Sequence, residues 1–288
     1  MKPVQVKRST AEVIEDSISR EGVRITTLRL RYPRIIHSEL MTHRMFSRNA
    51  QSSRATPVRT LIESVRRDPY FPTQWNRAQK GMVPGDKLTG MDRLRCEKLW
   101  REALESALDT AEQLADIGAA KEQVNRLLEP FSYINVLVTA TDWQNFFDLR
   151  LSSDAQLEIQ HLARAMKLAM KNSLPVCRQW HLPFVPESYR PTSGEGILTQ
   201  SDAFSISAAR CARVSYLRFD GKEPSIEDDV KLTQRLYASG HMTPFEHAAI
   251  AVDGSSIYNA NFRGWFSMRY AIERMDAGAQ FLEQSENE

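Results

Sequence analysis

The sequence has few cysteines and no excess of charge of either sign. Its three cysteines, Cys96, Cys177 and Cys211, are scattered and odd in number. They therefore exclude a disulfide framework and favour a reducing, cytoplasmic compartment. The 38 basic and 36 acidic side chains give a net charge of +2, which excludes the broad basic field that non-specific nucleic-acid binding needs. Any site for an anion must therefore be built locally.

Long apolar runs and the commonest nucleotide-binding patterns are also missing. No window stays apolar for the length of a membrane span, and the first residues carry acids and no apolar core, which argues against a signal peptide. Neither G-x-G-x-x-G after a strand nor G-x-x-x-x-G-K-[ST] occurs. The 288 residues, of which 42% are hydrophobic, are enough to bury a large core.

Metal ligands and reactive cysteines give only weak signals. None of the six histidines forms an H-E-x-x-H pair, and the spacing of Cys177 and His181 is a weak hint of a metal. Cys211 lies in no nucleophile motif and is expected to be a small core residue. We therefore predict no metal site and no cysteine nucleophile.

The apolar periodicity predicts strands and helices in a mixed order. Strands are expected at residues 22–33 and 247–252, where β-branched and apolar residues cluster. Helices are expected where apolar residues recur at helical spacing, in residues 34–46, 96–118, 121–129, 153–173, 204–214, 224–239 and 259–275. Loops are expected at residues 47–54 and 70–90, and Ser153 with Gln156 matches a capping box. This order favours the α+β class over a doubly wound sheet.

Residues 40–55, "LMTHRMFSRNAQSSRA", gather arginines among small polar side chains. Arginine makes two parallel hydrogen bonds to phosphate or carboxylate, and Ser, Asn and Gln add neutral donors. The stretch therefore predicts an anion pocket, and the alternative is a solvated helix end with surface salt bridges. A second arginine, Arg150, is expected just before a helix N-terminus, which also favours anions. Its alternative is an ordinary surface charge.

The same stretch resembles the signature of the flavin-dependent thymidylate synthases, in which R-H-R is followed by seven residues, a serine and a nearby arginine. His43 and Arg44 match the last two letters of R-H-R, while Ser52 and Arg54 match the serine and the arginine. Three positions depart from the pattern that the resemblance implies. Thr42 replaces the first arginine, Ala50 replaces a glutamate, and Ser53 replaces a small, glycine-like position.

Further segments resemble other parts of the same family. Asn145 and Arg150 in "NFFDLR" match a segment ending N-L-R, and Arg126 matches an arginine that acts on the nucleotide. The segments "RCARVSYLRF" and "LYASGHMTPFEHAAIAV" resemble the family's opening elements. The residues that fall on these last two patterns are Ser215, His241, Thr243, Glu246 and His247.

The order of these segments differs from the family's order. The family's opening elements come last here, and a second copy of the lead-in to R-H-R follows His247, with Met268 in place of the histidine and Arg269 after it. We therefore predict a circular permutation within one domain over residues 1–288. It comprises an R-H-R- and N-L-R-like segment at 1–175, a linker at 176–200 and an opening segment at 201–288. Because the two lead-in copies resemble one element, the strands near 23–30 and 248–252 are expected in one sheet.

The resemblance implies a central antiparallel or mixed sheet flanked by long helices, and a transfer of one carbon to C5 of dUMP to give dTMP. It implies FAD, methylenetetrahydrofolate as donor, NADPH as a candidate reductant, and a homotetramer with active sites between subunits. No nucleic-acid or membrane partner is implied. The catalytic residues that it implies are Arg150, Ser52 and Arg44. The implied substrate-binding residues are Arg54, Arg126, Ser52, Ser53, Gln51 and Glu39. The implied flavin-binding residues are His43, Asn49, Asn145, Ser215, His241, Thr243 and Glu246.

Two alternatives to this function stay open. Thr42 and Ala50 are smaller than the residues they replace, so water could reach the transferred carbon and give 5-hydroxymethyl-dUMP. The same two departures also leave open a nucleotide-binding protein without catalysis. We favour methylation, because a subunit interface or the long loop at residues 70–90 can close the space.

Overall fold

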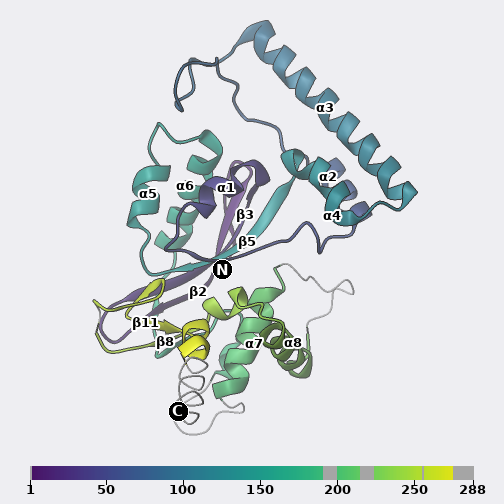
Figure 1. Ribbon diagram of the computed structural model, residues 1–288. Helices are drawn as coiled ribbons and strands as arrows, with labels where there is room; N and C mark the ends of the chain where they lie inside the picture. Colours follow the sequence, from purple (N-terminus) through teal and green to yellow (C-terminus); the bar gives the residue numbers. More distant parts are fainter. Residues whose placement is uncertain (1, 191–199, 215–223, 255, 275–288) are drawn as a thin grey trace, which may run out of the picture.

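A six-stranded sheet forms the centre of the larger part of the molecule (Figure 1). The computed structural model describes residues 2–190, 200–214, 224–254 and 256–274. The strands of the main path follow one another in the order β1 (Val4–Val6), β2 (Ser9–Ile18), β3 (Arg24–Pro33), β5 (Tyr133–Ala140) and β4 (Ser47–Ala50), and neighbours are antiparallel. β6 (Val176–Cys177) pairs with β2 in parallel. With the helices packed on it, this sheet confirms the α+β class.

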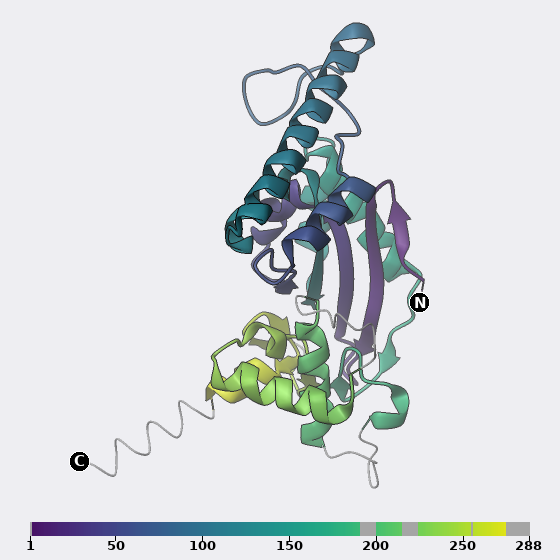
Figure 2. The same cartoon turned by 90° about the vertical axis from the view of Figure 1, so that its right-hand side faces the viewer.

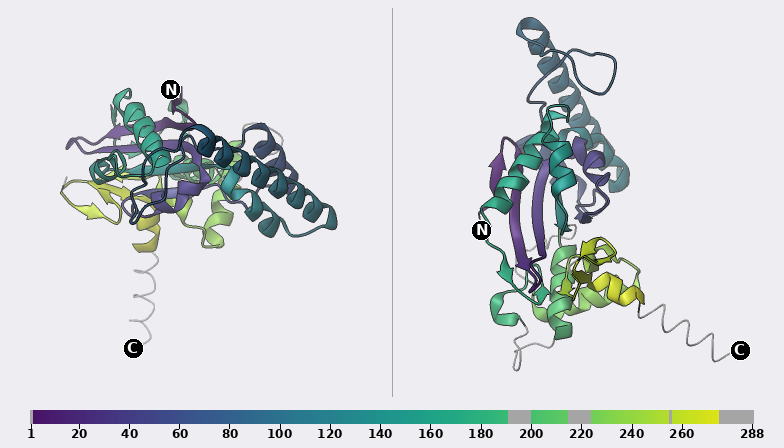
Figure 3. Two further views of the ribbon diagram at one scale, coloured as in Figure 1. Left: turned by 90° about the horizontal axis from the view of Figure 1, so that it is seen from above. Right: turned by 90° about the vertical axis from the view of Figure 1, so that its left-hand side faces the viewer.

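The alternation of side chains along the strands explains which face is buried. In β3, Leu28 and Leu30 point into the main core, while Arg31 on the opposite face forms an ion pair with Asp68. α6 (Leu157–Lys171) lies along the apolar face, as Figure 3 shows, and contributes Ile159 to the same core. Burial of these apolar side chains is the main force that holds sheet and helix together.

The second group of helices packs beside the sheet and projects beyond it (Figure 2). It comprises α2 (Val58–Arg67), α3 (Gly90–Ile117), α4 (Lys121–Val124) and the 3₁₀ helix η2 (Asn125–Phe131). The long helix predicted at residues 96–118 is confirmed, although it begins six residues earlier. Gly118 ends it in the left-handed conformation, with a φ of 85°, which suits glycine because it has no Cβ. The loop predicted at residues 70–90 is confirmed over residues 70–89 and ends where α3 begins.

The C-terminal part lies below the main sheet in Figure 2. Its helices are α7 (Gln200–Ala212) and α8 (Ile226–Ala238), followed by η4 (Thr243–Glu246). A three-stranded sheet has the order β11 (Trp265–Ser267), β8 (Ala249–Ala251) and β7 (Trp180–His181), next to a hairpin of β9 (Tyr258–Asn259) and β10 (Phe262–Arg263). The two helices and the strand predicted for this part are confirmed. Ser225 caps α8 through a capping box.

Several predicted elements are wrong at positions that matter for the site. The helix expected at residues 34–46 is only η1 (Arg34–Ile36) and α1 (His37–Met41), so His43 and Arg44 lie in the turn after it. Residues 47–50 form β4 rather than a loop, because they pair with the buried strand β5. The helix expected at 259–275 is mostly strands and turns, with a left-handed Gly264 at a φ of 66°, and turns helical only at residues 268–274.

Two smaller expectations at helix ends are also wrong. Arg150 ends α5 (Gln144–Arg150) instead of preceding a helix, so the local helix dipole favours a cation there. The N-cap of α6 is Gln156, whose side chain makes no capping hydrogen bond, so Ser153 takes no part in a capping box.

The strands near residues 23–30 and 248–252 lie in different sheets, so the prediction that they share one is wrong. Both edges of β8 are occupied by β7 and β11, and both edges of β3 by β2 and β5. The two sheets nevertheless share a buried cluster that includes Ile25, Ala249 and Trp265. The indole Nε1 of Trp265 donates to the carbonyl of Val23 at 3.0 Å. The sheets are therefore packed against each other rather than continuous.

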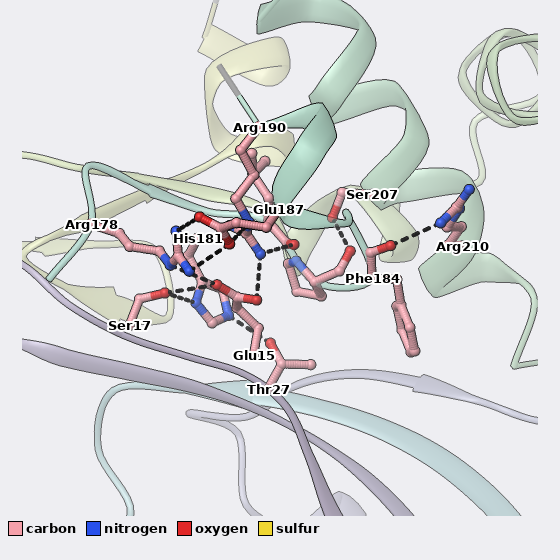
Figure 4. A network of polar contacts seen from close by, with 12 residues as sticks. Glu15, Ser17, Thr27, Arg178, His181, Phe184, Glu187, Arg190, Ser207 and Arg210 are labelled. Atoms are coloured by element: carbon pink, nitrogen blue, oxygen red, sulfur yellow. Dashed lines mark hydrogen bonds and ion pairs between the residues drawn. The ribbon is translucent and has the colours of Figure 1, made fainter. Parts of the chain in front are cut away.

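A strap at residues 178–190 ties the main sheet to the C-terminal helices (Figure 4). Glu15 of the sheet lies between Arg178 and Arg190, with an Arg190 Nη2–Glu15 Oε2 distance of 2.6 Å. At the other end of the strap, Arg210 of α7 donates to the carbonyl of Phe184 at 3.0 Å. The first half of the segment that was expected as a linker thus carries short strands, η3 (Glu187–Tyr189) and buried ion pairs.

A chain of buried hydrogen bonds crosses the same boundary. His181 bonds through Nδ1 to Ser17 and through Nε2 to Thr27, at 2.9 and 2.7 Å. Thr27 contacts Thr139, which contacts His247 Nδ1 at 2.8 Å. Burial lowers the pKa of both histidines, to about 3 for His247, so both are neutral at pH 7. Both ring nitrogens of His181 are thus engaged, and the part of the chain that the structure describes holds no cluster of three or more metal-ligating side chains.

No helix within the described ranges has both the length and the apolar content for a bilayer crossing.

Candidate active site

Arg150 and His43 form the centre of the candidate site. Arg150 comes from the last turn of α5, and His43 from the turn after α1. The guanidinium donates from Nε to His43 Nε2 at 2.8 Å and from Nη2 to Thr42 Oγ1 at 3.1 Å, and its Nη1 lies 3.6 Å from Glu39 Oε2. The structure thus joins Arg150, His43 and Glu39 as neighbours, which are three of the residues expected in the site.

The electrostatics of this cluster keep the imidazole neutral. Burial, then the charges of Arg150 and Arg48, lower the pKa of His43 to about 4. Since Nε2 accepts a hydrogen bond from Arg150, the ring proton resides on Nδ1. Burial raises the pKa of Glu39, and the charge of Arg150 opposes that rise. Arg150 therefore provides the positive charge of the cluster, and His43 orients it without competing charge.

A pocket of about 380 Å³ opens beside this cluster. Aromatic rings of Phe46 and Phe146 form part of its wall, and Phe146 meets the His43 ring edge-on at 4.9 Å. Arg44 and Asn145 lie at its exposed rim. The full lining comprises Thr42, His43, Arg44, Met45, Phe46, Asp142, Gln144, Asn145, Phe146 and Leu149. An aromatic wall with an amide and a guanidinium at its rim suits a flat ring system that carries anionic groups.

A second pocket of about 270 Å³ begins at Ser47, the first residue of β4, directly after Phe46 of the first pocket. Ser47 lines it, together with Glu246 of η4 and Arg269 of the C-terminal segment, and the Arg269 Nη1–Glu246 Oε1 distance is 2.6 Å. Asn49 of β4 donates to the carbonyl of Cys211 in α7 at 2.8 Å. β4 thus lines the second pocket through Ser47 and contacts both C-terminal elements that resemble the family's opening segments.

The remaining residues predicted to bind flavin, where the structure describes them, are not among those that line the two pockets. Thr243 and His241 are exposed at and before η4, which packs against β4. The side chain of His241 has no part in the described clusters around Arg150 and Glu246, while its backbone N–H donates to Leu236. Ser215 lies outside the described residues.

The arginines predicted for the nucleotide form a separate group, with Arg54 in the loop between β4 and α2 and Arg126 on η2. Arg54 pairs with Glu122 at 3.2 Å, and Arg126 pairs with Glu129 at 2.9 Å. Asn125 ties the loop to this helical segment, because its Nδ2 donates to the carbonyls of Ser53 and Thr56 at 2.7 and 2.9 Å. The Arg54 and Arg126 side chains are 71% and 59% exposed, so each can exchange its carboxylate partner for a ligand at modest cost.

The loop between β4 and α2 presents the predicted small polar residues beside these arginines. The backbone N–H of Arg54 donates to Ser52 Oγ at 3.2 Å. Gln51 contacts Asn135 of β5 through its own N–H at 2.8 Å and through Oε1 at 3.0 Å. Ser53 is buried. The structure therefore places Gln51, Ser52, Ser53 and Arg54 on one loop, which Asn125 ties to the segment that carries Arg126, whereas the observed contacts of Arg150 lie on α1 and in the turn after it.

Three residues that link the two groups were not assigned a role from the sequence. Arg34 pairs with Glu129 at 3.0 Å, and that carboxylate also takes Arg126. His37 Nδ1 bonds to the hydroxyl of Tyr32 at 2.8 Å, and burial followed by the charge of Arg34 lowers the pKa of His37. Arg48 donates to the carbonyl of Met41 at 2.6 Å, at the end of α1. For Arg34 and His37, the available signal in the sequence was the pair of polar side chains in "YPRIIH", directly after a buried strand.

Comparison with known proteins places the chain in a family. The Thy1 family, described as thymidylate synthase complementing protein, matches residues 21–176, which is more than half of the chain. The chain therefore belongs to this family, that of the flavin-dependent thymidylate synthases. A "Flavin-dependent thymidylate synthase" from Kosmotoga olearia is 26% identical over 159 residues, which cover 54% of this chain and 66% of that protein.

The chain thus spans just under two thirds of the length of that curated relative. The family match includes β3, β4, β5, α5 and α6, and hence both arginine groups of the site. Residues after 176, which include η4 and all residues that line the second pocket except Ser47, lie outside the matched segment.

Proposed function

We propose that this protein transfers a one-carbon unit from methylenetetrahydrofolate to C5 of dUMP and gives dTMP, with FAD as its cofactor. The observation that carries the proposal is the placement of Arg150. Inside the family-matched segment, it is held by His43, Thr42 and Glu39 at the edge of an aromatic-walled pocket of about 380 Å³.

The residues around the two pockets fit a flavin. Phe46 and Phe146 offer apolar faces, while the rim residues Asn145 and Arg44 offer donors for polar and anionic groups. The residues proposed to hold FAD are His43, Asn49, Asn145, Ser215, His241, Thr243 and Glu246. Bound there, FAD would supply the hydride chemistry, and the protein side chains supply orientation and charge.

Different arginines would contact different parts of the nucleotide. Arg54 and Arg126, with Gln51, Ser52 and Ser53, would hold the phosphate and the sugar. Glu39 would contact the nucleotide from α1, and Arg44 would act with Ser52 next to the reacting base. Arg150 would donate to the uracil and stabilise the negative charge that develops as C5 becomes nucleophilic.

We further propose the circularly permuted order and a single domain. Their support is that α7 and η4, which come from the late segments, contact the family-matched strand β4. A homotetramer and NADPH as reductant complete the proposal and follow from the family resemblance alone.

The nucleotide part of the proposal predicts a weakened dUMP complex for Arg54→Ala and for Arg126→Ala. Each change should raise the dissociation constant of dUMP by the equivalent of about 1.5–3 kcal/mol, the range for charge-assisted hydrogen bonds. Calorimetric titration of the flavin-saturated protein measures it. Arg59→Ala is the matched control, since Arg59 of α2 is an exposed arginine that pairs with Asp116 of α3 at 2.9 Å. Unchanged dUMP affinity in both site variants would rule out this phosphate site.

A further inference from the structure

Thr42 stands where the family pattern has the first arginine of R-H-R, yet its hydroxyl is fully used. Its Oγ1 donates to the carbonyl of Glu39 at 2.7 Å, one turn earlier in α1. The single proton of the hydroxyl is therefore donated to the Glu39 carbonyl, and the lone pairs of Oγ1 can accept a hydrogen bond from another donor. That donor is Arg150 Nη2, at 3.1 Å.

The contacts of Arg150 come from one short segment of chain. His43 accepts from Nε, Thr42 accepts from Nη2, and Glu39 lies beside Nη1. Two donors of the planar guanidinium, Nε and Nη2, are thus fixed by adjacent residues, His43 and Thr42. Two fixed donors of a planar group define its orientation, whereas one leaves it free to rotate.

An arginine at position 42 would disturb this arrangement. The end of α1 already receives a second guanidinium, because Arg48 Nη1 donates to the carbonyl of Met41 at 2.6 Å. A third cation at position 42 would lie against Arg150, and like charges within about 4 Å repel strongly near a partly buried site. It would also remove the acceptor that Thr42 provides.

We propose that Thr42 is a positioning residue for Arg150: its hydroxyl, anchored on the Glu39 carbonyl, holds the guanidinium in the orientation that His43 also selects. The inference rests on the proposed function only for the consequence in turnover. Thr42, which departs from R-H-R, then contributes to the function of this site. Restoring the family's arginine at position 42 should lower turnover.

Three variants test the proposal through the kinetics of the flavin-saturated protein. Thr42→Val removes the acceptor at nearly constant volume and should lower kcat by about 10-fold, the scale of one hydrogen bond to a charged group, with a smaller change in KM for dUMP. Thr42→Ser keeps the hydroxyl and should restore turnover. Thr42→Arg, which recreates the family signature, should lower kcat at least as much as Thr42→Val. Turnover of Thr42→Arg above that of the wild type would overturn the proposal.

A second measurement reads the position of Arg150 without any catalysis. The charge of Arg150 is one of the causes that lower the pKa of His43 to about 4. Release of the guanidinium in Thr42→Val should therefore raise the His43 pKa, as followed by NMR titration of the full chain. Thr110→Val is the control, because the exposed Thr110 hydroxyl donates only to the Ser106 carbonyl, at 2.8 Å, on α3.

The two readouts separate the positioning role from the proposed function. If the wild-type protein shows no synthase activity, the proposed function is contradicted. A raised His43 pKa in Thr42→Val would still support the positioning role in that case. An unchanged His43 pKa in Thr42→Val, with normal signals in the Thr110→Val control, contradicts the positioning role whatever the activity.

Discussion

Replacing Arg150 by alanine should lower the turnover of dUMP by about 100-fold or more, the effect of removing one preorganised donor to a developing negative charge. Arg150 is held by His43, Thr42 and Glu39, so its guanidinium is oriented before the substrate binds. Its charge matters most when C5 of the uracil becomes nucleophilic, so kcat should fall by more than dUMP affinity does. Single-turnover kinetics with a parallel dUMP titration measure both quantities.

The conservative variant sharpens this test. Arg150→Lys keeps a positive charge but has no planar fork, so it cannot bond to Thr42 and His43 at once. We expect it to remain closer to Arg150→Ala than to the wild type. Arg150→Ala that keeps more than half of the wild-type kcat would show that this arginine has no role in the reaction.

Replacing Asp229 by alanine should destabilise the protein by about 3–5 kcal/mol, the cost of removing one partner from a buried ion pair. The Asp229 side chain is 0% exposed and forms ion pairs with Arg210 and Arg213, at 2.9 and 2.8 Å. Its removal deprives two partly buried guanidinium groups of the counter-charge that Asp229 provides. Arg210 also holds the carbonyl of Phe184 in the strap, so the loss should loosen the contact of α7 and α8 with the main sheet.

Urea unfolding followed by circular dichroism gives the free energy of unfolding for this comparison. Asp116→Ala is the control, since Asp116 is 67% exposed and pairs with the equally exposed Arg59 at 2.9 Å. Exposed pairs contribute about 0–1 kcal/mol. A loss below about 1 kcal/mol in Asp229→Ala would mean that the ion pairs of Asp229 contribute little to the packing of α7 against α8.

Elements with a strong local pattern could be predicted from the sequence. α3 carries Leu104, Leu108 and Ala111 on one face and ends at Gly118, and β3 is rich in β-branched and apolar residues and ends at Pro33. β4 could not be predicted, because "SRNA" has no strand periodicity and pairs only because β5 is buried beside it. β5 itself, "YINVLVTA", does carry the β-branched signal and was overlooked.

The composition of the site could be predicted better than its geometry. Family motifs pointed to His43 and Arg150, which are 107 residues apart in sequence, but no spacing rule predicts their 2.8 Å contact. Arg34 was missed because its role depends on Glu129, which η2 carries into place from another part of the chain. Apolar residues at helical spacing misled the prediction for residues 259–275, where the left-handed Gly264 and its neighbours form strands and turns.

The most direct measurement is incubation of the protein with FAD, a reductant, methylenetetrahydrofolate and dUMP, followed by mass analysis of the nucleotide. The proposed function predicts stoichiometric flavin uptake, seen as a change in flavin absorbance, and a product with the mass of dTMP. A product heavier than dTMP by one oxygen would replace methylation by hydroxymethylation at the same site. Flavin uptake without any modified nucleotide, or no flavin uptake at all, would contradict the proposal that this chain is a synthase.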